Sequence, residues 1–245
     1  MSGSTHDVCG DHSRDESASG RPAPAPTWHT ALLVSLYVCV AIAGVVLHGR
    51  IGAPAPASQA TERITAIYAP LIVVQLALAL YVCRIGRGRW ALSAMIGRRW
   101  TSGRRLVADL ALAAAAWLFI VTIELASHRL FASSTAASVT AMLPRSSSER
   151  GVWVIAAVVV GCCEEIVFRG YFLAQFTALT GRAKLAIVAQ AALFALAHAE
   201  QGAAAMVRIA IYGLAFGAIA HRRQSLLPGI ACHVATDLAS GLLPP

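Results

Sequence analysis

The chain has 245 residues, of which 57% are hydrophobic and 13% charged, and its formal net charge is +8. A mean hydropathy of +0.64 excludes an ordinary soluble domain and predicts a protein that crosses a membrane several times. Almost all of the positive charge comes from arginines in short segments between apolar runs. Arginines placed there set topology and contact lipid headgroups, so we expect no nucleic-acid partner.

Residues 1–28 are polar and rich in Ser, Gly, Asp, Pro and Ala. Such a segment cannot bury enough apolar surface to fold, so we expect a disordered tail. Its start has no apolar core of the kind found in cleaved signal peptides. The first apolar run is therefore expected to act as an uncleaved signal anchor.

Seven apolar runs follow, each about long enough to cross a hydrocarbon layer of ~30 Å as a helix. They lie near residues 30–47, 64–83, 106–126, 152–177, 184–200, 205–220 and 226–243. Between the third and fourth runs, residues 127–150 are amphiphilic and predict an interfacial or re-entrant linker, so seven and eight spans both stay open. The expected fold class is an all-α, polytopic bundle, divided into a tail (1–28), a three-span region (29–126), the linker (127–150) and a C-terminal core (151–245).

Basic residues test this segmentation, because cytoplasmic loops carry an excess of Lys and Arg. With the N-terminus inside and seven spans, the inner segments 84–105, 169–184 and 221–225 hold twelve of the twenty basic residues, and the outer loops hold five. This favours a multi-pass protein of the cell membrane with a cytoplasmic N-terminus. A further crossing within 127–150 would invert the last four spans.

The cysteines do not indicate a metal ribbon, because their spacing fits none, and most of them lie in apolar runs. We interpret them as small apolar packing residues. The six are Cys9, Cys39, Cys83, Cys162, Cys163 and Cys232.

Two adjacent carboxylates, Glu164 and Glu165, lie inside the fourth apolar run. A charge at the centre of a membrane helix costs about 2.5–3.5 kcal/mol, so such a pair indicates function by default. Arg169 is four residues after Glu165 and faces it on a helix, so it can neutralise that carboxylate. Glu164 is rotated by about 100° from its neighbour and stays uncompensated, which suits a general base. A purely structural ion pair with Arg169 is the alternative.

Two later runs carry histidines. His233 and Asp237 are four residues apart and share one face of the last run, while His198 lies one turn after Phe194 on the fifth. Each histidine alone is equally consistent with a structural role. Three apolar runs that each bring a Glu or His to the bundle interior predict a functional site there.

The depths of the two histidines raise a difficulty. Counted from the inner ends of their runs, His198 is about 20 Å deep and His233 about 10 Å deep. They can meet only if helices are tilted, broken or longer than the runs indicate. Pro228 and Gly229 make an irregular start of the last run reasonable.

Three short patterns therefore follow one another on successive apolar segments: Glu164-Glu165-x3-Arg169, Phe194-x3-His198 and His233-x3-Asp237. In this order they resemble the CPBP family, the intramembrane proteases related to the type II CAAX prenyl endopeptidase and to bacteriocin-processing or immunity proteins. The resemblance covers roughly residues 150–240.

The resemblance implies a catalytic core with a conical intramembrane cavity and an endopeptidase that cleaves a membrane-anchored protein or peptide in the lipid bilayer. It implies that Glu164 and His198 activate a water molecule, and that His233 and Asp237 stabilise the oxyanion. The supporting residues implied are Glu165, Arg169 and Phe194.

Asp237 departs from the pattern, because many family members have Asn there. An ionised carboxylate cannot donate to an oxyanion, so Asp237 would be protonated, orient His233 or bind a metal. The family has been described both as metalloproteases and as glutamic proteases. A zinc set of Glu164, His198 and His233 stays open, and we favour a metal-free mechanism because no pair has the HExxH spacing.

Two other functions compete with the protease. One is a non-catalytic immunity or scaffold protein of the same fold, and the other is a proton-coupled transporter, because intramembrane Glu, His and Asp also mark ion pathways. The adjacent Glu pair and the lack of a visible inverted repeat favour the protease.

Overall fold

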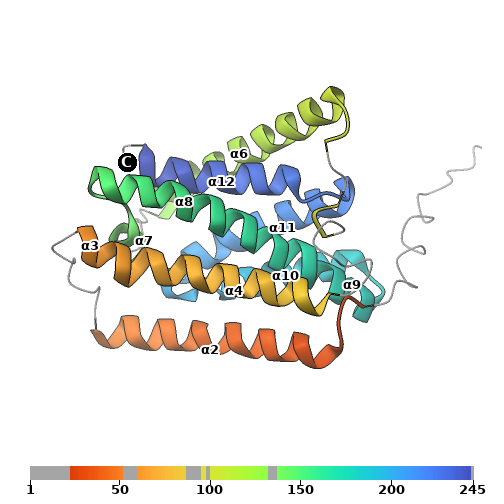
Figure 1. Cartoon of the computed structure of the whole chain (residues 1–245), viewed down its shortest axis with the longest axis horizontal. Coiled ribbons are helices and arrows are strands. Elements are labelled where there is room, and N and C mark those ends of the chain that lie inside the picture. Colours follow the sequence, from red (N-terminus) through yellow and green to blue (C-terminus); the bar gives the residue numbers. More distant parts are fainter. Residues whose placement is uncertain (1–22, 52–59, 87–94, 98–99, 132–136, 244–245) are drawn as a thin grey trace, which may run out of the picture.

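The structure is a computed structural model that describes residues 23–51, 60–86, 95–97, 100–131 and 137–243. Within these ranges the chain is helical, and the only extended pairing is an isolated bridge between Gly97 and Ser225. The long helices lie side by side in one bundle (Figure 1), which confirms the all-α class predicted from the sequence.

The described elements are, in chain order, α2 (Thr27–Ile51), α3 (Ala60–Arg63), the π-helix η1 (Ile64–Tyr68), α4 (Ala69–Ile85), α6 (Gly103–Phe131), α7 (Ala137–Met142), α8 (Ser147–Glu164), the π-helix η3 (Glu165–Phe172), α9 (Leu173–Thr180), α10 (Ala183–Leu196), the 3₁₀ helix η4 (Ala199–Gln201), α11 (Ala203–Arg223) and α12 (Leu227–Leu242).

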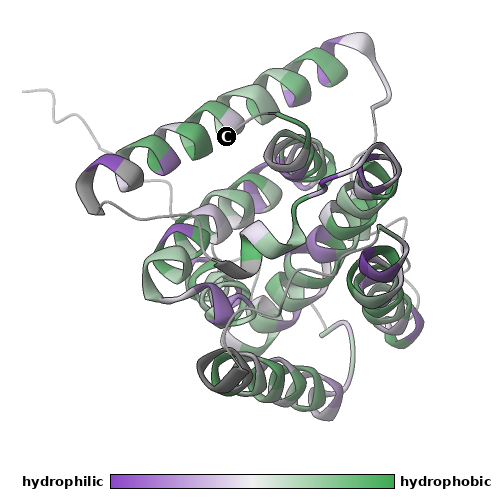
Figure 2. Ribbon diagram, turned by 90° about the vertical axis from the view of Figure 1, so that its left-hand side faces the viewer, coloured by the Kyte–Doolittle hydropathy of each residue, from purple (hydrophilic) through white to green (hydrophobic). Residues whose placement is uncertain are grey.

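Each of the seven predicted apolar runs contains a helix, and Figure 2 shows hydrophobic residues along all the main helices. Five described stretches are long and apolar enough to cross a membrane: Thr27–Val46, Ala60–Ile85, Gly103–Ser127, Ser147–Thr180 and Ala203–Arg223. The helices α10 and α12 are shorter, with 14 and 16 residues. Large apolar side chains such as those of Val73, Val107 and Val207 are exposed on the bundle, as contact with lipid requires. The chain is a multi-pass membrane protein.

The predicted tail and linker are described in part. Residues 1–22 and 132–136 lie outside the described ranges. Just before α2, the backbone of Ala25 is buried and exchanges two hydrogen bonds with the side-chain amide of Gln175, at 3.2 and 3.0 Å. In the linker, α7 has six residues, too few to cross a bilayer.

A buried ion pair joins the linker to the second span. Arg63 pairs with Glu149 at 3.0 Å, and both side chains are almost fully buried. The same guanidinium donates to the carbonyl oxygens of Ala141 and Leu143, at 2.8 and 2.7 Å. The linker is therefore held against the start of this span.

The fourth span changes its helical pitch beside the carboxylates. The α-helical part α8 ends at Glu164, and η3 continues as a π-helix from Glu165 to Phe172. A second π segment, η1, precedes α4, where Pro70 cannot donate a backbone hydrogen bond. Wide turns of this kind are often found at functional sites.

Glycines let the helices around this span approach closely. A Cβ atom at Gly161 of α8 would lie 2.8 Å from a side-chain atom of Val234 in α12. One at Gly241 would lie only 2.2 Å from Nε1 of Trp153, which donates to the carbonyl oxygen of Asp237 at 2.9 Å. A Cβ atom at Gly213 of α11 would lie 2.9 Å from the Cα of Ala191 in α10. Small residues at helix contacts are the main means of close packing in membranes.

Replacing Gly213 with Ala should destabilise the fold by about 1–3 kcal/mol, because the new methyl group meets the backbone of α10 and overpacks the contact. At Gly151 of α8, an added Cβ atom would meet no neighbouring element within 4 Å, so Gly151→Ala should stabilise the helix by about 0.5–1 kcal/mol. Thermal unfolding in detergent would measure both. Equal effects of the two changes would contradict the close packing of α10 and α11.

Candidate active site

Glu164 and Glu165 lie at the junction of α8 and η3, where the side chains point into the protein. Glu164 is 7% exposed and Glu165 is fully buried. A buried carboxylate is costly unless it is paired and hydrogen-bonded. The partners of these two groups therefore define the site.

Glu165 has two cationic or ionisable partners. Its Oε1 lies 3.0 Å from the NH1 atom of Arg169 and 3.1 Å from Nδ1 of His233. The first contact is the ion pair that the four-residue spacing predicts. Gly229 makes the approach of α12 possible, because a Cβ atom there would lie 2.8 Å from the other Glu165 oxygen.

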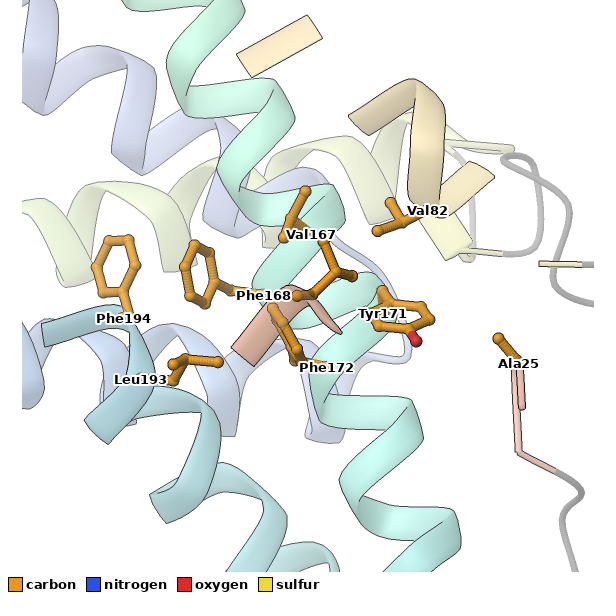
Figure 3. Close-up of a cluster of buried hydrophobic side chains, with 9 residues drawn as sticks. Ala25, Val82, Val167, Phe168, Tyr171, Phe172, Leu193 and Phe194 are labelled. Carbon is orange, nitrogen blue, oxygen red and sulfur yellow. The ribbon is translucent and has the colours of Figure 1, made fainter. Parts of the chain in front are cut away.

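Aromatic rings enclose the Arg169 guanidinium. Its central carbon lies 4.2 Å from the ring centre of Phe194 and 5.1 Å from that of Phe216. The three guanidinium nitrogens have no aligned hydrogen-bond acceptor among the described residues, so charge pairing and cation–π contact stabilise this group. Figure 3 shows Phe194 beside Phe168 in the cluster of buried side chains at this point.

His233 connects the three carboxylates. While Nδ1 faces Glu165, its Nε2 lies 3.7 Å from Oε2 of Glu164 and 3.9 Å from Oδ2 of Asp237. The imidazole stacks on the ring of Phe216, with 5.6 Å between ring centres. The i,i+4 pair His233 and Asp237 thus shares one face of α12, as its spacing predicts.

His198 occupies a different position from the one its helical run predicts. The helix α10 ends at Leu196, so His198 lies in the turn before η4, and this break in the run removes the need for a long straight fifth span. Its Nδ1 atom is 2.8 Å from the carbonyl oxygen of Phe194. The rings of His198 and His233 both border Phe194, at 4.9 and 6.1 Å between ring centres.

The described residues show no hydrogen bond or ion pair between His198 and Glu164. The structure therefore brings Glu164, Glu165, Arg169, His233 and Asp237 together directly. It places His198 beside them across the Phe194 ring.

A zinc site needs three protein ligands that converge on one point. No three His, Cys, Asp or Glu side chains within the described ranges gather as a ligand set. The zinc alternative of Glu164, His198 and His233 forms no such set among the described residues, and no hydrogen bond or ion pair joins His198 to Glu164 there.

Gln75 is a polar neighbour of Glu164 that is absent from the residues predicted for the site. It lies on α4, and its Nε2 donates to Oε1 of Glu164 at 2.7 Å. A signal is present in the sequence, since Gln75 is a polar residue within an apolar span, between Val74 and Leu76. The prediction missed it because it drew only on polar groups in the last four apolar runs.

Removing one member of the buried pair should unfold much of the protein. Glu165→Leu leaves the Arg169 charge uncompensated, and Arg169→Met does the same to Glu165, so each should cost about 3–5 kcal/mol of unfolding free energy. The double variant should recover most of that loss while lacking activity. Thermal unfolding of the three variants in detergent measures this, and single variants as stable as the parent would refute the ion-pair argument.

Comparison with known families fits this geometry. Residues 146–239 match the family described as type II CAAX prenyl endopeptidase Rce1-like. No curated protein and no solved structure matches the chain. The matched range starts at Ser146, the residue that caps α8, and ends within α12, so it holds both Glu residues and both site histidines. This C-terminal part of the chain is therefore similar to the Rce1-like family, which is consistent with a protease of the CPBP family.

Proposed function

We propose that this protein is an intramembrane endopeptidase that hydrolyses a peptide bond of a membrane-anchored protein or peptide, with Glu164 as the general base. The observation that supports this most is the placement of Glu164 against His233, with 3.7 Å between Oε2 and Nε2. A carboxylate that can take a proton then lies next to a group that can donate one, which peptide hydrolysis requires.

Glu164 suits the base because no arginine or lysine pairs with it among the described residues. Arg169 pairs with Glu165, and the close partner of Glu164 Oε1 is the neutral amide of Gln75. In the proposed step, Glu164 takes a proton from water while the hydroxyl oxygen attacks the scissile carbonyl carbon. The carbonyl oxygen becomes an oxyanion. When the carbon–nitrogen bond breaks, Glu164 returns the proton to the leaving nitrogen.

His233 is proposed to stabilise the oxyanion. When both ring nitrogens carry hydrogen, Nδ1 donates to Glu165 and Nε2 can donate to an oxyanion near Glu164. Such a donor is worth about 3–4 kcal/mol in the transition state. Asp237 is proposed to keep the ring oriented, since its Oδ2 lies 3.9 Å from Nε2. His198, on the other side of Phe194, is proposed to assist water activation.

The arrangement supports a protease better than a proton-coupled transporter. A relay needs its ionisable groups spread along the membrane normal, whereas Glu164, Glu165 and Asp237 all lie within 4 Å of one imidazole. An immunity or scaffold protein of the same fold would keep the helices but would not need Glu164. The cell membrane, a cytoplasmic N-terminus and a CAAX-type or bacteriocin-type substrate belong to the proposal.

Replacing the proposed base is the direct test. Glu164→Gln should lower cleavage by about 10³-fold or more, because a neutral amide cannot take the proton. His198→Ala and His233→Ala should each lose most activity and remain folded. The measurement is a proteomic search for new peptide termini in membranes of cells that express the parent chain or Glu164→Gln.

Glu62→Gln serves as the control, because Glu62 is an exposed carboxylate in the first turn of α3. Termini that appear with the parent and with Glu62→Gln, but not with Glu164→Gln, support the proposal. Identical sets of termini in all three samples would refute it and favour a non-catalytic role.

Metal removal distinguishes the two family mechanisms. Because the described site residues form no three-ligand set, we expect the purified, active protein to keep its activity after treatment with a chelator. Less than one zinc ion per chain should be found by elemental analysis. Activity that is lost on chelation and restored by zinc would contradict the metal-free mechanism.

A further inference from the structure

The polar contact between α4 and α8 differs from the other contacts of the site, because one of its residues comes from the N-terminal spans. Gln75 lies inside the second span, six residues after Ala69 at the start of α4 and outside the range matched to the family. Its Nε2 atom donates to Oε1 of Glu164 at 2.7 Å. Glu164 thus has a close partner from the N-terminal region of the chain.

The two oxygens of Glu164 have different neighbours. Oε1 accepts from Gln75, and Oε2 faces Nε2 of His233 at 3.7 Å. A carboxylate rotates freely about its last bond unless contacts hold it. Because Gln75 holds Oε1, the other oxygen stays directed at His233.

The chemistry of the partner also matters. Arg169 compensates the charge of Glu165 at 3.0 Å. A second cation beside Glu164 would stabilise its charged form and weaken it as a base. The amide of Gln75 donates a hydrogen bond and brings no net charge, so it orients the carboxylate and leaves it able to take a proton.

Gln175 uses its buried amide in a different way from Gln75. The Gln175 amide uses both ends on the Ala25 backbone, so all of its polar atoms serve a tether. Gln75 keeps Oε1 buried, with no hydrogen-bond partner among the described residues. The hydrogen bond of the Gln75 side chain among these residues is therefore the one to Glu164.

We propose that Gln75 is a positioning residue of the active site, which acts through Glu164 by directing Oε2 toward His233 and the scissile bond. This rests on the proposed function. It makes the N-terminal spans part of the catalytic unit, although they lie outside the family match.

Gln190 of α10 provides a matched control. It is fully buried, its Nε2 donates to the backbone oxygens of Gly213 and Ile187 at 2.8 and 3.0 Å, and its Oε1 is also unpaired. It differs from Gln75 in having no carboxylate partner in the described structure. Gln75→Met and Gln190→Met therefore remove the same amide chemistry at two places.

The experiment measures cleavage by the full chain in proteoliposomes. The probe is an internally quenched farnesylated CAAX peptide, with the same peptide on a single transmembrane anchor as the second probe. Gln75→Met should lower kcat about 10- to 100-fold, as expected for a lost hydrogen bond to a charged group, and KM less than about threefold. Gln190→Met should keep kcat within about twofold per folded molecule.

A double variant distinguishes the effect of the hydrogen bond from the effect of where the carboxylate lies. Gln75→Glu combined with Glu164→Gln restores an amide–carboxylate pair with the partners exchanged. It should regain the melting temperature lost by Gln75→Glu alone and stay inactive, because the carboxylate now comes from α4. If Gln75→Met does not fold, Gln75→Asn takes its place, with a loss of kcat in the same direction.

The outcomes are distinct. A parent that cleaves while Gln75→Met or its Asn substitute keeps kcat within threefold overturns the inference and leaves the proposed function intact. Equal losses in Gln75→Met and Gln190→Met overturn it as well, because they show a structural effect. A parent that cleaves neither probe and produces no new termini in cells overturns the proposed function, and the positioning role with it.

Discussion

The site depends on one buried carboxylate, that of Glu165, which joins the η3 helix to α12. It pairs with Arg169 one turn further along the same helix and with His233 of α12, while its own side chain is fully buried. Charges removed from water are stable only when they meet good partners, so this three-way contact decides where α12 lies relative to the fourth span. Gly229 and Gly161 allow the close approach that this contact requires.

With α12 in that position, Glu164 faces Nε2 of His233, the ring nitrogen that does not face Glu165. The two adjacent carboxylates therefore have different partners. Glu165 is neutralised and supports the structure, and Glu164 keeps only neutral or ionisable neighbours. The change from α-helical to π-helical pitch occurs between them. The rings of Phe194 and Phe216 exclude water from the Arg169 guanidinium, which strengthens its pairing with Glu165.

Much of the fold was predictable, because apolar runs of about twenty residues have few alternatives to membrane helices. Four-residue spacing also predicted the pair Glu165 and Arg169. The sequence could not show that α10 ends at Leu196, since residues 185–197 are apolar apart from Gln190, nor that the Phe194 ring lies between His198 and His233. The bond from Gln75 to Glu164 joins residues 89 apart, and no periodicity within one helix reveals such a pair.

The position of Gln75 links the site to the lipid. The same helix that carries Gln75 exposes Val73, Val74 and Leu80 on its outer surface. A helix in contact with acyl chains changes its tilt when the bilayer becomes thinner or thicker. Any such tilt would change the distance between Gln75 of α4 and Glu164 of α8. Hydrocarbon thickness would then set the rate of the proposed hydrolysis, and the protein would have different activities in membranes of different composition.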